Sequence, residues 1–139
     1  MTLVSVFNTH PRYKVQNSVF RKLAQSVFAR EGTRTAKCSV IFVNDKRMVE
    51  LNATYLRHNY TTDVLSFPLH NPGEPLEGEV YVNIDQARRQ ARKFKATYKA
   101  ELARLVIHGA LHLLGYDDST ERNKKRMSRL EDRYLLLLD

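Results

Sequence analysis

Two histidines and an aspartate in the last third of the chain have the types and spacing of metal ligands. His108 and His112 are four residues apart, and Asp118 follows after Gly115. On a helix, side chains at positions i and i+4 leave the same face, so both imidazoles can bind one ion. Gly115 permits a sharp turn that can return the Asp118 carboxylate to the two rings. This donor set suits zinc, and three protein ligands leave a position open for water, as in catalytic sites.

The same histidine spacing occurs in zinc peptidases, in which a glutamate directly after the first histidine is the general base. Here that position is Gly109, which cannot transfer a proton. The pattern therefore predicts the ligand geometry of a zinc hydrolase and disfavours a metallopeptidase. Two histidines on a helix can also be ordinary packed side chains, and that structural interpretation stays open at this point.

A metal held by three protein ligands can lower the pKa of its bound water and polarise a phosphoryl oxygen, so the site suits phosphodiester cleavage. The base would be the activated water itself or the 2′-hydroxyl of an RNA substrate. Asp117 neighbours the site, but we expect it to act in a turn or as a helix cap.

Strands and helices alternate before the histidines, and helices accumulate after them. Runs rich in β-branched and aromatic residues predict strands at 2–7, 38–43, 64–67 and 79–84, with a loop at 70–78. Helical spacing of apolar residues predicts helices at 14–30, from 45 onward, at 86–94, at 98–114 and after 119. This order predicts an α+β fold, with a single mixed sheet of about four strands and helices packed on it. We expect one domain over residues 1–139.

Caps and apolar stripes position the helices. Asn44 or Asp45, then Asp85, then Asp118 or Ser119 are the predicted N-caps. On the 98–114 helix, the histidines lie beside the predicted core stripe of Leu102, Leu105, Val106, Gly109 and Leu113. The metal site is thus expected near the end of a helix in the C-terminal half of the chain, at the edge of the core. In the last helix, the residues expected to face inward are Met127, Leu130, Tyr134, Leu137 and Leu138.

The chain is strongly basic, with 23 Lys and Arg against 15 Asp and Glu and a net charge of +8. Such a surplus attracts polyanions, of which nucleic acid is the commonest in the cytosol. Arg88, Arg89 and Arg92 are the first candidates for RNA contacts, and a second basic run spans residues 122–133. Either run can also be a solvated helix face.

Other features of the composition favour a cytoplasmic protein. No apolar run is long enough to span a bilayer, and the N-terminal residues do not have the pattern of a signal peptide. The single cysteine, Cys38, lies in an apolar run and is expected to be buried.

Around these residues the sequence resembles the YbeY family of bacterial endoribonucleases. Residues 108–118 read HGALHLLGYDD and match the family signature H-G-x-L-H-L-x-G-Y-D-H at every defined position but the last. Residues 62–68 read TDVLSFP, a second family block, and Gly78-Glu79-Val80 and Leu51-Asn52 match two shorter ones. The resemblance extends over residues 51–118, and the order of elements fits the full length.

The resemblance implies a zinc-dependent, single-strand-specific endoribonuclease with one zinc ion per chain. It also implies a role in maturation of small-subunit (16S) ribosomal RNA and in ribosome quality control, with ribosomal RNA and the small subunit as partners. A non-catalytic ribosome-assembly or RNA-binding factor with a structural metal is the alternative.

The sequence departs from the family pattern at two positions. The third metal ligand is usually histidine, and here it is Asp118, a harder donor that leaves the identity of the metal open. Where the family carries an arginine after the Leu-Asn block, an ungapped match puts Leu56, with Arg57 one position later. Arg57 is therefore a candidate catalytic residue, with a plain surface role as its alternative.

Overall fold

The computed structural model describes residues 1–138, in which strands and helices alternate before three helices follow one another. In chain order the elements are β1 (Thr2–Asn8), α1 (Asn17–Arg30), β2 (Ala36–Val43), α2 (Asp45–Leu56), β3 (Val64–Pro68), β4 (Leu76–Asn83), α3 (Ile84–Lys93), α4 (Tyr98–Leu113) and α5 (Glu121–Leu135).

One mixed sheet carries the fold. Its strand order is β1-β2-β4-β3, with β1, β2 and β4 parallel and β3 antiparallel to β4. The predicted α+β class with a four-stranded mixed sheet is confirmed. Because β3 pairs only with β4 among the strands of residues 1–138, it lies at an edge of the sheet, where a strand leaves backbone groups unpaired on its outer side.

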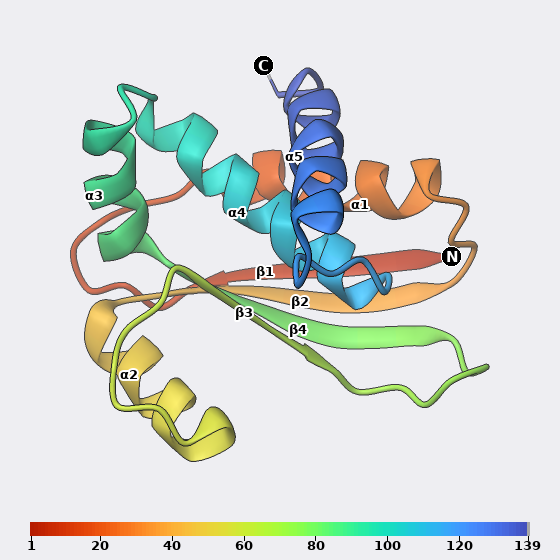
Figure 1. The fold of residues 1–139 in the computed structure, drawn as a ribbon, viewed down its shortest axis with the longest axis horizontal. Helices are drawn as coiled ribbons and strands as arrows, with labels where there is room; N and C mark the ends of the chain where they lie inside the picture. The colour runs from red at the N-terminus through yellow and green to blue at the C-terminus, as the bar shows by residue number, and fades with distance from the viewer. Residues whose placement is uncertain (139) are drawn as a thin grey trace.

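Helices cover the two faces of the sheet unequally. In Figure 1, α1, α4 and α5 lie on one side of the sheet and α2 lies on the other. Successive side chains of a strand point to opposite faces, so β4 sends Val80 and Val82 into the main core and Tyr81 toward α2. The smaller cluster under α2 is formed by Val43, Met48, Leu51 and Leu65.

Two glycines let α4 lie close against the sheet. A Cβ atom at Gly109 would come within 2.3 Å of Val80 Cγ1, and the carbonyl of Gly109 accepts a hydrogen bond from Ser66 Oγ at 3.0 Å. A Cβ atom at Gly78 of β4 would come within 2.5 Å of Leu113 Cδ2. The histidine-bearing end of α4 is thereby fixed against β3 and β4.

Several predicted boundaries need correction. The first helix begins at Asn17 rather than at residue 14. The fourth strand begins at Leu76 rather than at residue 79, because Gly78, expected in a loop, pairs with Cys38 of β2 and with Pro68 of β3. Leu137 and Leu138 lie beyond the end of α5, although both pack against the core.

Two predicted helix caps are also wrong. Asn83, not Asp85, caps α3, by accepting a hydrogen bond from the Gln86 amide. Asp85 is instead bound by the His10 ring at 2.8 Å and by the Asp45 amide at 2.9 Å. At the start of α2, Asn44 is the cap, as one of the two predicted alternatives had it.

At α5 the cap is Thr120, whose hydroxyl accepts from the Asn123 amide, and neither Asp118 nor Ser119 takes that role. The Asp118 side chain is therefore not used to start the helix. Elsewhere, Cys38 is buried as predicted, and burial, with a smaller contribution from Glu79, raises the pKa of its thiol to about 12. None of the helices in residues 1–138 is both long and apolar enough to cross a bilayer.

Candidate metal centre

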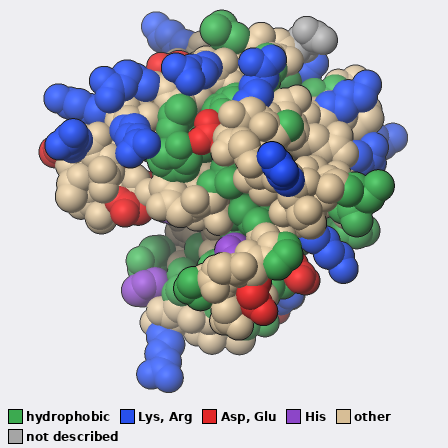
Figure 2. Space-filling view, turned by 90° about the vertical axis from the view of Figure 1, so that its right-hand side faces the viewer, with side chains coloured by type: hydrophobic (Ala, Val, Ile, Leu, Met, Phe, Trp, Pro, Cys, Tyr) green, Lys and Arg blue, Asp and Glu red, His purple; other side chains and the backbone are tan. Residues whose placement is uncertain are grey.

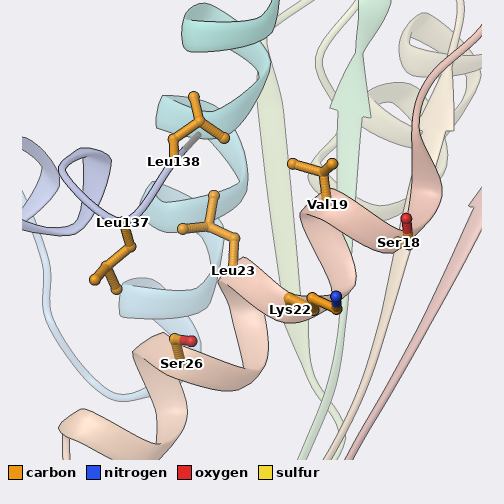
Figure 3. A pocket seen from close by; sticks show the side chains of 7 residues that line it. All are labelled: Ser18, Val19, Lys22, Leu23, Ser26, Leu137 and Leu138. Carbon is orange, nitrogen blue, oxygen red and sulfur yellow. The ribbon is translucent and has the colours of Figure 1, made fainter.

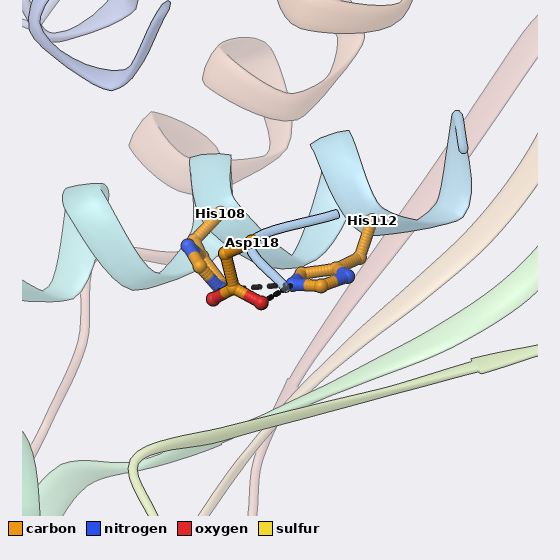
Figure 4. Close-up of side chains that lie close together, drawn as sticks. All are labelled: His108, His112 and Asp118. Carbon is orange, nitrogen blue, oxygen red and sulfur yellow. Dashed lines mark hydrogen bonds and ion pairs between the residues drawn. The ribbon is translucent and has the colours of Figure 1, made fainter. Parts of the chain in front are cut away.

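The structure brings His108, His112 and Asp118 together at the C-terminal end of α4. The Nε2 atoms of His108 and His112 are 3.0 Å apart. Asp118 Oδ2 lies 3.7 Å from His108 Nε2, and Asp118 Oδ1 lies 3.9 Å from His112 Nε2. Figure 4 shows both rings and the carboxylate directed toward one point, with the carboxylate arriving from the turn after α4.

These separations fit a metal ion. Zinc–ligand distances of about 2.1 Å in tetrahedral geometry put neighbouring donor atoms roughly 3.4 Å apart. The three observed separations, from 3.0 to 3.9 Å, lie on both sides of that value. One donor atom from each residue lies within 4.8 Å of the others, close enough for the three residues to hold one ion.

The turn after α4 is built to return Asp118 to the rings. Gly115 has φ +100°, which a residue with a side chain rarely adopts, and its amide donates to the His112 carbonyl. Asp117 accepts hydrogen bonds from the Ser119 amide at 3.1 Å and from Asn123 Nδ2 at 2.7 Å. Asp117 thus has the predicted turn role, and these bonds hold its pKa below the ordinary value.

Glu131 and Arg104 join this site, and neither was predicted from the sequence. Glu131 of α5 is buried, and its Oε2 lies 2.7 Å from His108 Nδ1. Arg104 Nη1, one helical turn before His108, donates to Glu131 Oε1 at 3.1 Å. Burial by itself lowers the pKa of His108, but the Glu131 carboxylate outweighs it, and the net pKa is raised.

The His112 ring has a different environment from the His108 ring. Burial, and then the neighbouring His108 ring, lower the pKa of His112. A lowered pKa favours the neutral imidazole, which is the form that binds metals. The His112 side chain is 31% exposed and that of Asp118 is 46% exposed, so solvent and a ligand can reach the trio.

The two histidines form one wall of a cleft. Its other wall is the edge strand β3, which contributes Val64, Leu65, Ser66 and Pro68. These strand residues lie within the 62–68 block that the sequence singled out. The cleft thus combines metal-ligand side chains with an apolar wall and a free strand edge.

The candidate arginine, Arg57, directly follows α2. Arg57 is exposed, ends α2 in a left-handed conformation with φ 57°, and belongs to the helix on the opposite face of the sheet from α4. Within residues 1–138, no hydrogen bond or ion pair that the structure gives links Arg57 to either histidine. A catalytic role for Arg57 stays a prediction.

The basic residues predicted to contact RNA differ in how they are held. Arg89 makes a two-pronged ion pair with Asp45, at 2.9 and 2.7 Å, and these hydrogen bonds lower the pKa of Asp45 to about 2. The Arg88 guanidinium lies 3.9 Å from the centre of the Tyr13 ring, whereas Arg92 is exposed.

The second basic run lies on α5, which begins three residues after Asp118. Figure 2 shows Lys and Arg side chains gathered over the upper part of one face and histidine surface in the hollow below them. The exposed basic residues of α5 are Arg122, Lys124, Lys125, Arg126, Arg129 and Arg133.

A second hollow lies between α1 and the segment after α5 (Figure 3). Its lining is Ser18, Val19, Lys22, Leu23 and Ser26 of α1 with Leu137 and Leu138. This lining offers hydroxyls, aliphatic groups and one ammonium, and no set of groups that could hold a metal. Among the described residues, the cluster that could hold a metal ion lies in the cleft beside α4.

The fold and the trio define a class of protein: an α+β domain with a solvent-accessible cluster of metal-ligand side chains between a helix and an edge strand. Residues 5–139 match the family described as Endoribonuclease YbeY. The chain belongs to this family of endoribonucleases, as the sequence resemblance predicted, and the predicted enzyme class is confirmed with it.

Named relatives agree with this assignment. Endoribonuclease YbeY of Chlorobium phaeovibrioides is 36% identical over 97% of this chain and 90% of its own length. That of Salinibacter ruber is 36% identical over 95% of this chain and 89% of its own. The solution structure of a Thermotoga maritima protein matches with a TM-score of 0.68 at 28% identity, covering 96% of this chain and 87% of that one.

Proposed function

We propose that this chain is a metal-dependent endoribonuclease that cleaves single-stranded RNA, with His108, His112 and Asp118 holding one zinc ion. The observation that carries the proposal is the convergence of these three donors in a cleft that solvent can enter. The preference for single strands, the ribosomal RNA substrate, the part in small-subunit maturation and quality control, and the cytoplasmic location follow from the family resemblance.

When bound, the metal would supply a Lewis acid and lower the pKa of a coordinated water. The residues of the chain would bind this ion and hold it in position. His108 and His112 present their Nε2 atoms toward the cleft, and Asp118 supplies an anionic oxygen from a turn that Gly115 and Asp117 stabilise.

The wall formed by β3 can position the substrate. Val64 and Pro68 offer apolar surface on which unstacked bases of a single strand can lie. The helix α5 begins three residues after Asp118, and its exposed basic side chains can contact phosphates of an RNA strand that enters the cleft.

The alternative is a non-catalytic assembly factor with a structural metal. Structural zinc sites are usually closed by four protein ligands, whereas catalytic sites keep a position for water or substrate. Three donors, one of them 46% exposed, beside an open cleft favour the catalytic interpretation.

Substitution of the histidines separates these functions. We expect His108→Ala and His112→Ala to reduce cleavage of a single-stranded ribosomal RNA fragment to background, while RNA binding and the circular dichroism spectrum are retained. The basic surface lies outside the trio, and a neutral imidazole carries no charge to lose. His70→Asn, in the β3–β4 connection, is the matched control and should cleave normally.

A chelator should stop cleavage by the wild-type protein, and added zinc or manganese should restore it. Cleavage that persists in His112→Ala would contradict the proposal. Loss of fold in both variants would indicate a structural metal instead.

A further inference from the structure

Glu131 is a buried carboxylate with both oxygens engaged. Its side chain is 9% exposed, Oε2 lies 2.7 Å from His108 Nδ1, and Oε1 accepts from Arg104 Nη1 at 3.1 Å. Burying a carboxylate costs free energy unless it is paired and hydrogen-bonded. Two partners on α4 meet that requirement, and they fix the plane of the carboxylate against one edge of the His108 ring.

The contact determines which nitrogen of His108 carries hydrogen. A carboxylate only accepts hydrogen bonds, so the proton of the neutral ring lies on Nδ1, which donates to Glu131. The lone pair of the neutral ring is then on Nε2, the atom that faces His112 and Asp118.

We propose that Glu131 is a positioning residue that holds His108 in the Nδ1–H tautomer and in the orientation needed for Nε2 to bind the metal, with Arg104 holding Glu131 in place. The proposal rests on the proposed function for the identity of the ligand, a divalent transition-metal ion. Histidine ligands of metals commonly donate their second nitrogen to a carboxylate in this way, which fixes the ring and strengthens the ligand.

His112 provides an internal comparison. Its only hydrogen bond that the structure gives within residues 1–138 is to His108 through Nε2. No carboxylate is given at its Nδ1, so its tautomer can change when an ion binds. Glu131 therefore acts on one of the two rings.

A purely structural role for Glu131 would be to join α5 to α4. Arg104 also makes an exposed ion pair with Asp132 of α5, at 3.3 Å, which contributes to that connection without touching His108. Asp132→Asn is therefore the matched control, because it removes a carboxylate that binds the same arginine one residue away.

The first test is made on metal-free protein by nitrogen-15 NMR of the histidine rings at about pH 9, well above the ordinary imidazole pKa of about 6.5. We expect His108 to carry its proton on Nδ1 in the wild type and in Asp132→Asn. In Glu131→Ala a substantial Nε2–H population should appear. A wild-type His108 protonated on Nε2 would overturn the proposal.

The second test is zinc affinity, measured by competition with a chromophoric chelator on variants whose fold is checked by circular dichroism. Loss of such a partner typically lowers metal affinity roughly 10- to 100-fold, and we expect that loss in Glu131→Ala. Glu131→Gln keeps a hydrogen-bond acceptor without the charge and should fall between Glu131→Ala and the wild type. Its isosteric side chain also keeps the test valid if the alanine variant does not fold.

The proposed function and the role of Glu131 can be contradicted independently of each other. A wild-type protein that does not bind zinc would contradict the proposed function, and the NMR result would still decide the role of Glu131. If zinc binds and Glu131→Ala and Glu131→Gln both match Asp132→Asn in affinity, Glu131 is not a positioning residue.

Discussion

Asp118 supplies a carboxylate where the family pattern has histidine, and the structure places Oδ2 near the His108 ring and Oδ1 near the His112 ring. A carboxylate is a harder ligand than imidazole, so we expect this trio to accept manganese more readily than a three-histidine site would. It also adds a negative charge, which attracts the cation. We therefore expect the preference of the site among metals to depend largely on this residue.

Substitution of Asp118 tests its role as a ligand. We expect Asp118→Ala to weaken zinc binding by more than about tenfold, which corresponds to about 1.4 kcal/mol. Asp118→His should retain or strengthen zinc binding and reduce the affinity for manganese relative to zinc. Isothermal titration with each metal gives both values. Equal zinc affinity of Asp118→Ala and the wild type would show that the residue is not a ligand.

The residues of the site differ in how far the sequence could predict them. The i, i+4 histidines and the glycine turn predicted the trio because these contacts are local along the chain. Glu131 reaches His108 from another helix, and the rotation of α5 about its axis depends on packing that no short motif specifies. Gly109 lies where zinc peptidases have the general base, and its predicted place on the core stripe agrees with its burial, since a Cβ atom there would come within 2.3 Å of Val80 Cγ1.

At the scale of elements, α3 and α5 carry similar positive charge in different settings. On α3, Arg89 is paired with Asp45 and Arg88 lies on the Tyr13 ring. Six basic side chains of α5 are exposed; Lys124 pairs with Glu121 and Arg126 lies over the Tyr116 ring, and the helix begins three residues after Asp118. We therefore expect α5 to make more phosphate contacts than α3, with Arg92 as the most available residue of α3.

Salt dependence distinguishes the two helices. For single strands, each lost phosphate contact reduces the slope of log affinity against log salt by about 0.7. The triple variant Arg122→Gln, Lys125→Gln, Arg129→Gln should reduce the slope by roughly 2 on that basis. Neutralising Arg88, Arg89 and Arg92 together should also flatten the slope, but by less.

Fluorescence anisotropy of a labelled RNA strand over a range of salt concentrations gives both slopes. An unchanged slope in the α5 variant, with a flattened slope in the α3 variant, would assign the phosphate contacts to α3. Unchanged slopes in both would make the two runs solvated helix faces.

Element order and type followed from apolar periodicity, whereas the predicted caps of α3 and α5 were wrong. Asp85 has the residue type of a cap, but its carboxylate is hydrogen-bonded to the His10 ring and to the Asp45 amide. Both partners come from distant segments of the chain. Thr120 caps α5 and leaves Asp118 available to the metal trio. Competition between local and long-range partners for one side chain is not visible in a short stretch of sequence.

At the scale of the whole molecule, the sheet and the helices on it bring together groups that are far apart in the chain. The number of strands and the mixed character of the sheet could be predicted, but the order β1-β2-β4-β3 could not, because pairing between distant strands leaves no local signal. That order puts β3 at the edge beside α4, and the cleft at the trio depends on it. The net charge of +8 attracts an anionic substrate to the molecule as a whole.

The central claim is that one metal ion at His108, His112 and Asp118 is required for RNA cleavage. Its most direct test is the cleavage rate of metal-free protein as zinc is added back in known equivalents, for the wild type and for His112→Ala. The rate should rise linearly and level off at one equivalent per chain in the wild type, and stay at background in His112→Ala. A wild-type rate that does not respond to zinc, or a His112→Ala rate that follows the wild type, would contradict the claim.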